Sequence, residues 1–307
     1  MRQIYTIGET VLDIIFQDFS AKASKAGGSM LNAAVSMGRL KLPVNFVSEY
    51  GQDDIGNFID NFLNENNINT SLVYRYKTGK TSISIANLDA NNNANYSFYK
   101  DLPEKRIDIK LTNINKNDII LFGSYFAINK DVHNQIIEFL KFAKEKEAII
   151  IYDPNYRKAH LYELEILKPL IIENMLLADI IRGSDDDFEM IFGAKNPVEA
   201  YTFIKHLCPN FICTSSKNQV FAFTENSETK VNIKKINPLS TIGAGDTFNA
   251  GLIYEIYKNN LGKEEIYSLN ELELNEIIHS AIEMATDVCL SYDNYISVQF
   301  AEKKLKS

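Results

Sequence analysis

The chain has few cysteines and few histidines. Cys208, Cys213 and Cys289 are the three cysteines among 307 residues, and they form no short pair of the kind that binds a metal ion. Three cysteines cannot all be joined to one another, so we expect buried, reduced thiols, which are typical of the cytoplasm. The four histidines also lack metal-ligand spacing, so the sequence predicts no zinc site; they are His133, His160, His206 and His279.

Long apolar runs are missing as well. No stretch approaches the roughly 18 uninterrupted apolar residues of a membrane helix, since even the run at 148–151 is closed by Asp153 and Pro154. Residues 1–8 lack the apolar core and the cleavage site of a signal peptide, and their alternation predicts a first strand. We therefore expect a soluble, cytoplasmic protein with no membrane partner.

Positive charge is in short supply. Lys and Arg number 32 against 40 Asp and Glu, which gives a formal net charge of −8. Nucleic-acid binding depends on clustered Lys and Arg that neutralise phosphates, so this balance argues against a nucleic-acid partner. A small anionic ligand stays open, because backbone amides at a helix N-terminus bind phosphate without net positive charge.

What the chain has is a regular alternation of apolar runs and helical patterns. With 307 residues and 45% hydrophobic content, it can bury one large core or two. Strands are expected at 118–122, 148–152, 179–181, 211–214 and 219–224, and helices at 131–146, 162–175, 244–257 and 271–290. This rhythm predicts an α/β fold with a central, mainly parallel sheet flanked by helices.

Two stretches break this rhythm, residues 10–22 and 72–100. The second has alternating strands at 81–88 and 95–99 around a polar turn, which is a hairpin signal. Strands inserted between helical units predict a small β-sheet that closes over a ligand as a lid. The predicted division is a core of residues 1–9, 23–71 and 101–307 and a β lid of residues 10–22 and 72–100. An apolar exposed face on the lid would pair with a second subunit and make a homodimer.

The segment 240–251 is a small-residue turn that runs directly into an apolar helical pattern. The first amides of a helix lack intrahelical partners and its dipole is positive there, so Gly243, Ala244 and Gly245 can donate to a phosphate. The segment matches neither the P-loop nor the dinucleotide-binding fingerprint. Taken alone, it is equally well explained by glycines that shape a loop and by Asp246 satisfying the helix N-terminus.

Residues 241–248, Thr-x-Gly-Ala-Gly-Asp-Thr-Phe, resemble the second signature of the ribokinase or PfkB family of carbohydrate kinases. The resemblance implies a ribokinase-like fold, ATP and Mg²⁺ as cofactors, and a monovalent cation as a further ion. It implies that the amides of Gly243, Ala244 and Gly245 hold the transferring phosphate and that Asp246 takes the proton from the sugar hydroxyl. The family usually opens this motif with an aspartate where this chain has Ser240, a change that affects a local contact or cation site.

A second constellation lies far away in sequence, at Asp13 and in the run 27–40. The pair Gly27-Gly28 lets the chain pass close to a ligand, and Asn32 offers a donor and an acceptor to a sugar hydroxyl. Taken alone, Asn32 also suits a helix start and Asp13 a turn. The segment is similar to the first PfkB signature, which implies that Asp13, Gly27, Gly28 and Asn32 face the sugar. The likeness continues at Gly51, Asp53, Asp54 and Gly56.

Matches in the middle of the chain are more divergent. Residues 153–157 resemble the family's D-x-N-x-R stretch at the carboxyl end of a strand, the edge where open parallel sheets bind ligands. Ser184 and Asp187 stand where the family has N-x-x-E, and Thr214 stands in a nucleotide-facing turn that has lost its glycines. The resemblance assigns metal binding through water to Asp187, and phosphate or nucleotide binding to Asn155, Arg157, Ser184, Thr214 and Thr241. An ion-paired loop arginine and an acidic helix start are the alternatives for Arg157 and Asp187.

The resemblance covers nearly the whole chain and implies transfer of the ATP γ-phosphate to a primary hydroxyl of a small sugar. Fructose is the leading acceptor, while ribose, a ketodeoxy sugar acid and a nucleoside stay open because the lid chooses the sugar in this family. A function of another class is a sugar-binding regulator with a kinase fold but no catalysis, motivated by the changes at Ser240, Ser184 and Asp187. Phosphorylation of a sugar distinguishes the two.

Overall fold

The chain forms two compact units, each built from segments far apart in sequence. Unit 1 comprises Met1–Ile4, Ile109–Ile236 and Gly251–Ile282, and unit 2 comprises Tyr5–Asp108, Asn237–Ala250 and Glu283–Ser307. The computed structural model describes residues 2–17, 20–88, 94–109, 113–215 and 218–306. Segments from both halves of the sequence therefore contribute to unit 2.

Unit 1 contains most of the large sheet. Its strands run in the spatial order β15-β14-β13-β12-β11-β10. They are β10 (Ile119–Gly123), β11 (Ile149–Asp153), β12 (Ile180–Ser184), β13 (Phe211–Ser215), β14 (Gln219–Phe223) and β15 (Glu228–Asn232). The pairs from β10 to β13 are parallel, and β14 and β15 are added antiparallel. Every residue of β10 and β11 is buried, as expected for parallel strands covered on both faces.

Helices follow the strands of unit 1 in the predicted alternation. They are η1 (Tyr125–Ile128), α3 (His133–Glu145), η2 (Lys158–Glu163), α4 (Leu164–Leu177), α5 (Asp185–Phe192), α6 (Pro197–Ile204) and α8 (Lys263–Ser268). Two longer helices, α7 (Ala244–Lys258) and α9 (Glu271–Cys289), have residues in both units. The α/β class with a large, mostly parallel sheet flanked by helices is confirmed.

Unit 2 contains the remaining strands and three helices. The large sheet ends here in the order β1-β4-β6, with β1 (Ile4–Ile7), β4 (Val44–Val47) and β6 (Ile68–Asn69). The helices are α1 (Ser29–Arg39), α2 (Asp54–Glu65) and α10 (Val298–Lys304). Helix α1 is buried from Ser29 to Gly38, which is the expected state of a helix with a continuous run of small and apolar residues.

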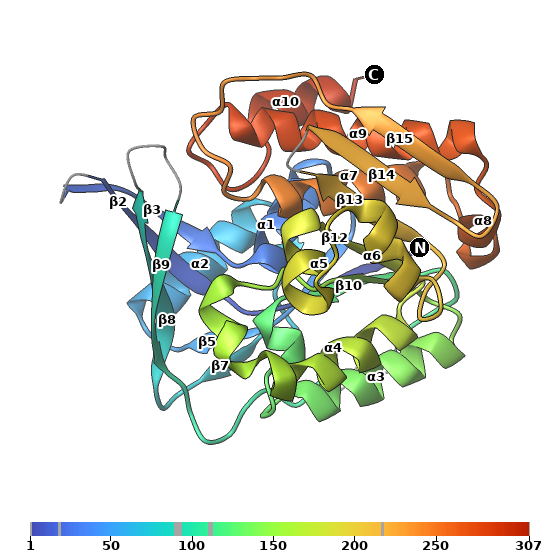
Figure 1. The fold of residues 1–307 in the computed structure, drawn as a ribbon. Coiled ribbons are helices and arrows are strands. Elements are labelled where there is room, and N and C mark those ends of the chain that lie inside the picture. Colours follow the sequence, from blue (N-terminus) through green and yellow to red (C-terminus); the bar gives the residue numbers. More distant parts are fainter. Residues whose placement is uncertain (1, 18–19, 89–93, 110–112, 216–217, 307) are drawn as a thin grey trace. The chain divides into compact units, whose positions relative to one another are not determined.

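A separate four-stranded sheet stands in unit 2 in the order β3-β2-β8-β9 (Figure 1). Its strands are β2 (Val11–Gln17), β3 (Ser20–Gly27), β8 (Lys80–Leu88) and β9 (Ala94–Asp101). β2 pairs with β8 in parallel, whereas β2–β3 and β8–β9 are antiparallel. The predicted small sheet is confirmed, the predicted turn at 89–93 lies outside the described residues, and the division of the chain into core and lid stays a prediction.

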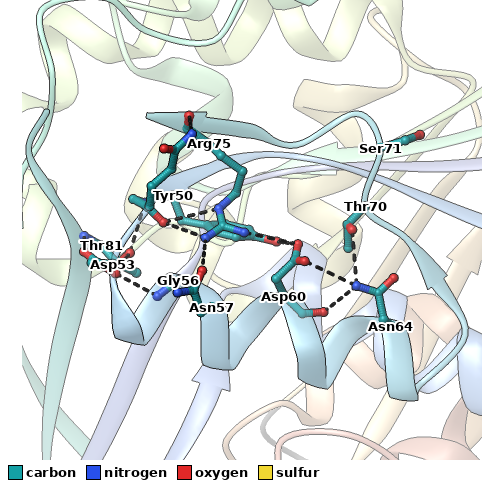
Figure 2. A network of polar contacts seen from close by, with 12 residues as sticks. Tyr50, Asp53, Gly56, Asn57, Asp60, Asn64, Thr70, Ser71, Arg75 and Thr81 are labelled. Carbon is teal, nitrogen blue, oxygen red and sulfur yellow. Dashed lines mark hydrogen bonds and ion pairs between the residues drawn. The ribbon is translucent and has the colours of Figure 1, made fainter. Parts of the chain in front are cut away.

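A polar network fastens the two-stranded sheet of β5 (Glu49–Gly51) and β7 (Tyr74–Tyr76) to α2 (Figure 2). The guanidinium of Arg75 lies 4.9 Å from the ring centroid of Tyr50. It donates to the carbonyl of Gly51 at 3.1 Å and to Asn57 Oδ1 at 2.7 Å. The Tyr50 hydroxyl in turn donates to Asp60 Oδ1 at 2.7 Å. The side chains of Tyr50 and Arg75 therefore both form hydrogen bonds with residues of α2.

Asp53 begins α2 and joins it to β8 (Figure 2). Its carboxylate accepts hydrogen bonds from the Gly56 amide and from the amide and hydroxyl of Thr81, at 2.7–2.8 Å. Burial raises the pKa of Asp53, but these hydrogen bonds outweigh it and hold the pKa below its usual value. A Cβ at Gly56 would lie 2.0 Å from the Gly51 carbonyl oxygen. These residues, which extend the family likeness, therefore stabilise the fold around α2.

The cysteines differ partly from expectation. All three are free, and Cys208 and Cys213 are buried, but Cys289 near the end of α9 is only partly buried. Burial raises the pKa of Cys208 to about 12, so its thiol stays protonated. Within the described part of the chain, no helix has the length and apolar character needed to cross a membrane.

Candidate active site

Asp13 sits on the buried face of β2. The strand alternates buried and half-buried residues, and Asp13 is 7% exposed. A Cβ at Gly27 would lie 2.0 Å from Asp13 Oδ2, so only glycine leaves room for this carboxylate at that position. Asp13 Oδ2 also accepts a hydrogen bond from Asn294 Nδ2 at 3.2 Å. The carboxylate is thus held between a glycine of β3 and a loop near the C-terminus.

Gly28 starts helix α1 in a conformation that favours glycine. Its φ is 122°, and a Cβ there would lie 2.2 Å from the carbonyl oxygen of Glu9. The Gly28 carbonyl accepts from the amide of Asn32 at 2.9 Å, which is the first full turn of the helix. The two glycines therefore bring the chain close to the Asp13 strand and turn it so that Asn32 follows one turn later.

Asn32 makes direct contact with the predicted base. Its Nδ2 donates to Asp246 Oδ2 at 2.8 Å, and the two side chains are 4% and 7% exposed. Asn32 Oδ1 is buried without a hydrogen-bond partner among the described residues. The sequence assigned both residues to one site, and unit 2 places them side by side. The direct bond between them was not predicted.

The glycine turn before α7 is shaped by the loop near the C-terminus. Gly243 has a φ of 79°, and a Cβ there would lie 2.2 Å from the carbonyl oxygen of Asn294. Helix α7 then begins at Ala244, and the Thr247 amide donates to the Gly243 carbonyl at 2.8 Å. The turn is half-buried at 243–245, so part of it reaches the surface of unit 2.

The amides of this turn are not equivalent. The Ala244 amide donates to the Thr241 carbonyl at a long 3.3 Å, whereas the amides of Gly243 and Gly245 precede the first intrahelical bond. Ser240, which replaces the family's aspartate, is buried, and its hydroxyl oxygen accepts from the Ile242 amide at 3.2 Å. Thr241 itself is exposed. Among the predicted phosphate donors, Gly243 and Gly245 are therefore better candidates than Ala244, and Ser240 stabilises the turn.

Asn294 is a residue that sequence reasoning missed. It is 1% exposed, its side chain donates to Asp13, and its carbonyl oxygen packs against Gly243. It thereby links the strand that carries the predicted sugar ligand to the turn that carries the predicted phosphate donors. No sequence signal pointed to it, because it lies in an irregular segment 281 residues away from Asp13.

Unit 1 holds the other predicted residues at the carboxyl ends of β11, β12 and β13. There Arg182 Nη1 pairs with Asp153 Oδ2 at 2.9 Å, and its Nη2 donates to Thr214 Oγ1 at 3.0 Å. Asp153 and Arg182 are both buried. Arg182 was also missed, although a charged residue inside the apolar run Ile-Ile-Arg-Gly was a usable signal, since buried charges are paired.

Asp187 serves as a helix-start carboxylate. Its Oδ2 accepts from the amide and the hydroxyl of Ser184 at 2.7 and 2.6 Å, and its Oδ1 accepts from the Tyr156 amide at 2.7 Å. With the Ser184 hydroxyl accepting from the Asp187 amide, these bonds form a capping box on α5. Burial, together with the nearby charge of Asp153, raises the pKa of Asp187. Both oxygens are engaged by protein donors, which is consistent with metal contact only through water.

Asn155 and Arg157 follow β11 in different environments. Asn155 has a φ of 40°, and its Nδ2 donates to Ser124 Oγ at 2.9 Å. Arg157 is exposed, and its positive charge partly offsets the raised pKa of Asp187, so both the phosphate-binding and the ion-paired interpretation stay predictions. An exposed guanidinium near this strand edge remains available to an anion.

Sequence comparison identifies the family of the chain. Residues 1–286 match the sequence model of the pfkB family carbohydrate kinases. The chain belongs to this family. A relative, probable fructokinase-7 of Arabidopsis thaliana, is 24% identical over 292 residues, covering 90% of this chain and 83% of the relative. The family membership makes the protein a sugar kinase without identifying its sugar.

Solved structures of other family members share the fold. A double mutant of Vibrio cholerae O395 fructokinase, solved with fructose, ADP and a potassium ion, has a TM-score of 0.86 at 19% identity, covering 99% of this chain and 98% of that chain. Aminoimidazole riboside kinase from Salmonella enterica, solved with aminoimidazole riboside and an ATP analogue, has a TM-score of 0.84 at 18% identity, covering 99% and 100%. Both are ribokinase-like sugar kinases, which confirms the fold class of this kinase.

Asn32→Ala is expected to lower kcat/KM for the sugar by roughly 10- to 100-fold, because hydrogen bonds to a charged group contribute about 1.5–3 kcal/mol. The variant loses the predicted sugar contact and also the hydrogen bond to Asp246, so both the sugar KM and kcat should change. Initial rates with sugar and ATP varied separately measure this, with exposed Asn64→Ala on α2 as the control. An unchanged kcat would show that Asn32 does not position Asp246.

Proposed function

We propose that this kinase transfers the γ-phosphate of ATP to a primary hydroxyl of a small sugar, with Asp246 as the general base. The observation that carries the proposal is the buried Asp246 carboxylate, which accepts a hydrogen bond from Asn32 and directly follows the glycine turn 243–245. A carboxylate within about 3 Å of the nucleophile accepts its proton as the new bond to phosphorus forms. The amides of Gly243 and Gly245 stabilise negative charge on the phosphoryl oxygens.

Fructose is the proposed acceptor. Asp13 and Asn32 bind its hydroxyls, and Gly27 and Gly28 let the backbone approach it. Support comes from relatives named fructokinase and from the Vibrio cholerae structure with fructose. Other relatives named 5-dehydro-2-deoxygluconokinase and aminoimidazole riboside kinase keep a sugar acid and a nucleoside on the panel of acceptors, together with ribose.

ATP is the proposed phosphate donor. The residues proposed to bind its phosphates and its nucleoside are Asn155, Arg157, Ser184, Thr214 and Thr241. The exposed Arg157 guanidinium suits a phosphate. Relatives solved with an ATP analogue or with ADP support a nucleotide donor. An ATP titration followed by calorimetry, with Arg157→Ala as the comparison, tests the assignment.

Mg²⁺ fits this chain as an ion that arrives with ATP. The described residues contain no group of three or more His, Cys, Asp or Glu that could cage a metal, and the oxygens of Asp187 already accept from the protein. Mg²⁺ commonly binds through substrate phosphates and keeps several waters, so Asp187 would reach it through water. When bound, Mg²⁺ neutralises phosphate charge.

A monovalent cation is also part of the proposal, because the Vibrio cholerae structure contains a potassium ion. Phosphorylation rates compared in potassium chloride and in tetramethylammonium chloride test it.

An acceptor panel tests the proposed function. Fructose, ribose, a ketodeoxy sugar acid and several nucleosides are each mixed with the enzyme, ATP and Mg²⁺, and ADP formation is followed. The expected result is sugar-dependent ADP formation that is fastest with fructose. Turnover with another acceptor would correct the substrate, and no turnover with any acceptor would reject the proposed reaction.

The four-stranded sheet is proposed to act as a lid and as a contact between two copies of the chain. On one face of this sheet the half-buried side chains of β2 and β8 are apolar, with Leu12 beside Ile83 and Ile14 beside Ile85. An apolar sheet face of this kind is better stabilised against a second copy than in water. Sedimentation velocity tests the dimer.

Three free cysteines support a cytoplasmic location. Cell fractionation tests this location.

Lid closure predicts a local change in amide exchange. Sugar binding should slow exchange in residues 10–22 and 72–100 because the closed lid excludes water from the reacting phosphate. Exchange followed by mass spectrometry with and without sugar measures this, and α6 serves as the internal reference. Uniform slowing across the whole chain would count against a lid.

A further inference from the structure

One row of residues crosses the small sheet on the same face as Asp13. Asp13 of β2 is paired with Ser84 of β8 and with Lys25 of β3. Paired residues on neighbouring strands point to the same face, and the strands lie about 4.8 Å apart. Burial agrees, because Ser84 is buried while its neighbours Ile83 and Ile85 on the opposite face are half-buried. Ser84 therefore stands directly beside the carboxylate of Asp13.

The hydroxyl of Ser84 is buried and lacks a hydrogen bond within the described part of the chain. Its side chain is 0% exposed, and its Oγ has no hydrogen-bond acceptor or donor among the described residues. Native proteins nearly always satisfy a buried hydroxyl, because taking it out of water without a replacement is unfavourable. An unsatisfied hydroxyl beside a carboxylate, in a sheet next to the predicted sugar ligands, indicates that something outside this chain completes it.

A second buried polar atom, Asn294 Oδ1, lies on the residue that contacts Asp13. Asn294 donates its Nδ2 to Asp13, but its Oδ1 is buried and has no partner among the described residues. Asn294 Oδ1 can accept a hydrogen bond, Ser84 Oγ can both donate and accept, and Asp13 accepts. A ligand with adjacent hydroxyl groups matches this set, because each hydroxyl both donates and accepts.

The charges around this face favour a neutral ligand. Lys25 forms an ion pair with Asp293, and Lys100 on β9 forms one with Glu9 at 2.9 Å. Both cations are thus compensated by the protein, whereas Asp13 adds negative charge beside Ser84. A carboxylate on the ligand would be repelled by Asp13 and would find these lysines already paired.

We propose that Ser84 binds a hydroxyl of a neutral sugar, next to the hydroxyl that Asp13 binds. The inference rests on the proposed sugar-kinase function and adds to it a specificity residue and a substrate class. Ser84 acts by holding the sugar and takes no part in moving the proton or the phosphate. Its loss therefore weakens sugar binding while the reacting groups stay in place.

The test is Ser84→Ala, measured by calorimetry with fructose in the absence of ATP and by steady-state kinetics. The sugar Kd and KM should rise about three- to tenfold, the range expected for one neutral hydrogen bond, while kcat and the KM for ATP stay within about twofold. Tm should stay the same or rise, because the variant no longer buries an unpartnered hydroxyl. A structural role would instead lower Tm. Ser24→Ala, exposed on the opposite face of the same sheet, is the control.

Deoxy sugars make the assignment specific. A monodeoxy analogue that lacks the hydroxyl bound by Ser84 should bind more weakly than fructose to the wild type but equally well to Ser84→Ala. Unchanged sugar affinity in Ser84→Ala, or no sugar binding to the wild type, would overturn the inference. Sugar binding that Ser84→Ala weakens, without any phosphorylation by the wild type, would support Ser84 while rejecting the proposed reaction.

Discussion

Asp246→Asn is expected to lower kcat by about 10²- to 10⁴-fold, the usual contribution of a general base. Asparagine keeps the shape of the side chain, and its amide oxygen can still accept the hydrogen bond that Asn32 donates to Asp246. It cannot take a proton from the sugar hydroxyl. Sugar affinity should stay nearly unchanged, because Asp13 and Asn32 are still present. Single-turnover rates and calorimetry on the folded variant measure the two quantities.

The matched control is Asp54→Asn. Asp54 is an exposed carboxylate in the first turn of α2, as Asp246 is a carboxylate in the first turn of α7. Both variants lose a favourable interaction with a helix N-terminus. Only Asp246→Asn should lose turnover. Near-normal turnover in folded Asp246→Asn would return this residue to the role of a helix-start carboxylate.

Gly243→Ala is expected to lower kcat by about 10²- to 10³-fold, comparable to the loss of an oxyanion donor. An alanine Cβ would lie 2.2 Å from the Asn294 carbonyl oxygen, so the turn must move and its amides with it. The positive φ of 79° adds about 1–2 kcal/mol of strain for a residue with a Cβ. Kinetics at saturating sugar and ATP measure the loss, and thermal unfolding measures the strain.

Gly193→Ala separates these two effects. Gly193 ends α5 with a similar φ of 72°, but a Cβ there meets nothing within 4 Å. This control should lose stability from backbone strain alone and keep its turnover. Equal kcat in the Gly243 and Gly193 variants would mean that the turn before α7 does not hold the phosphate.

The fold was predictable because local patterns agreed with it. The strands β10 and β11 are short apolar runs closed by polar residues, and the helices between strands have clear apolar periodicity. The alternation at residues 81–88 likewise predicted a strand of the small sheet. Such signals depend on neighbours within a few residues, so one sequence is enough to recognise them.

The site was predictable only where glycines and carboxylates stand in a motif. The glycine turn before Asp246 and the Gly27-Gly28 pair fall in this class. Asn294 contacts Asp13, which lies hundreds of positions away in sequence, and Gly243, which lies tens of positions away. No local pattern encodes these contacts. Ser84 is another case, because its importance comes from its register with Asp13 and from its missing partner. Pairing and burial exist only in the folded chain.

The most direct test of the account is product analysis in one tube. Wild type and Asp246→Asn are each mixed with fructose, ATP and Mg²⁺, and ³¹P NMR follows the ATP γ-phosphate. In the wild type, we expect a sugar phosphorylated on a primary hydroxyl and ADP in equal amounts. Product formation should be far slower in Asp246→Asn. Fructose that binds to the wild type while neither it nor any other acceptor is phosphorylated would contradict the account.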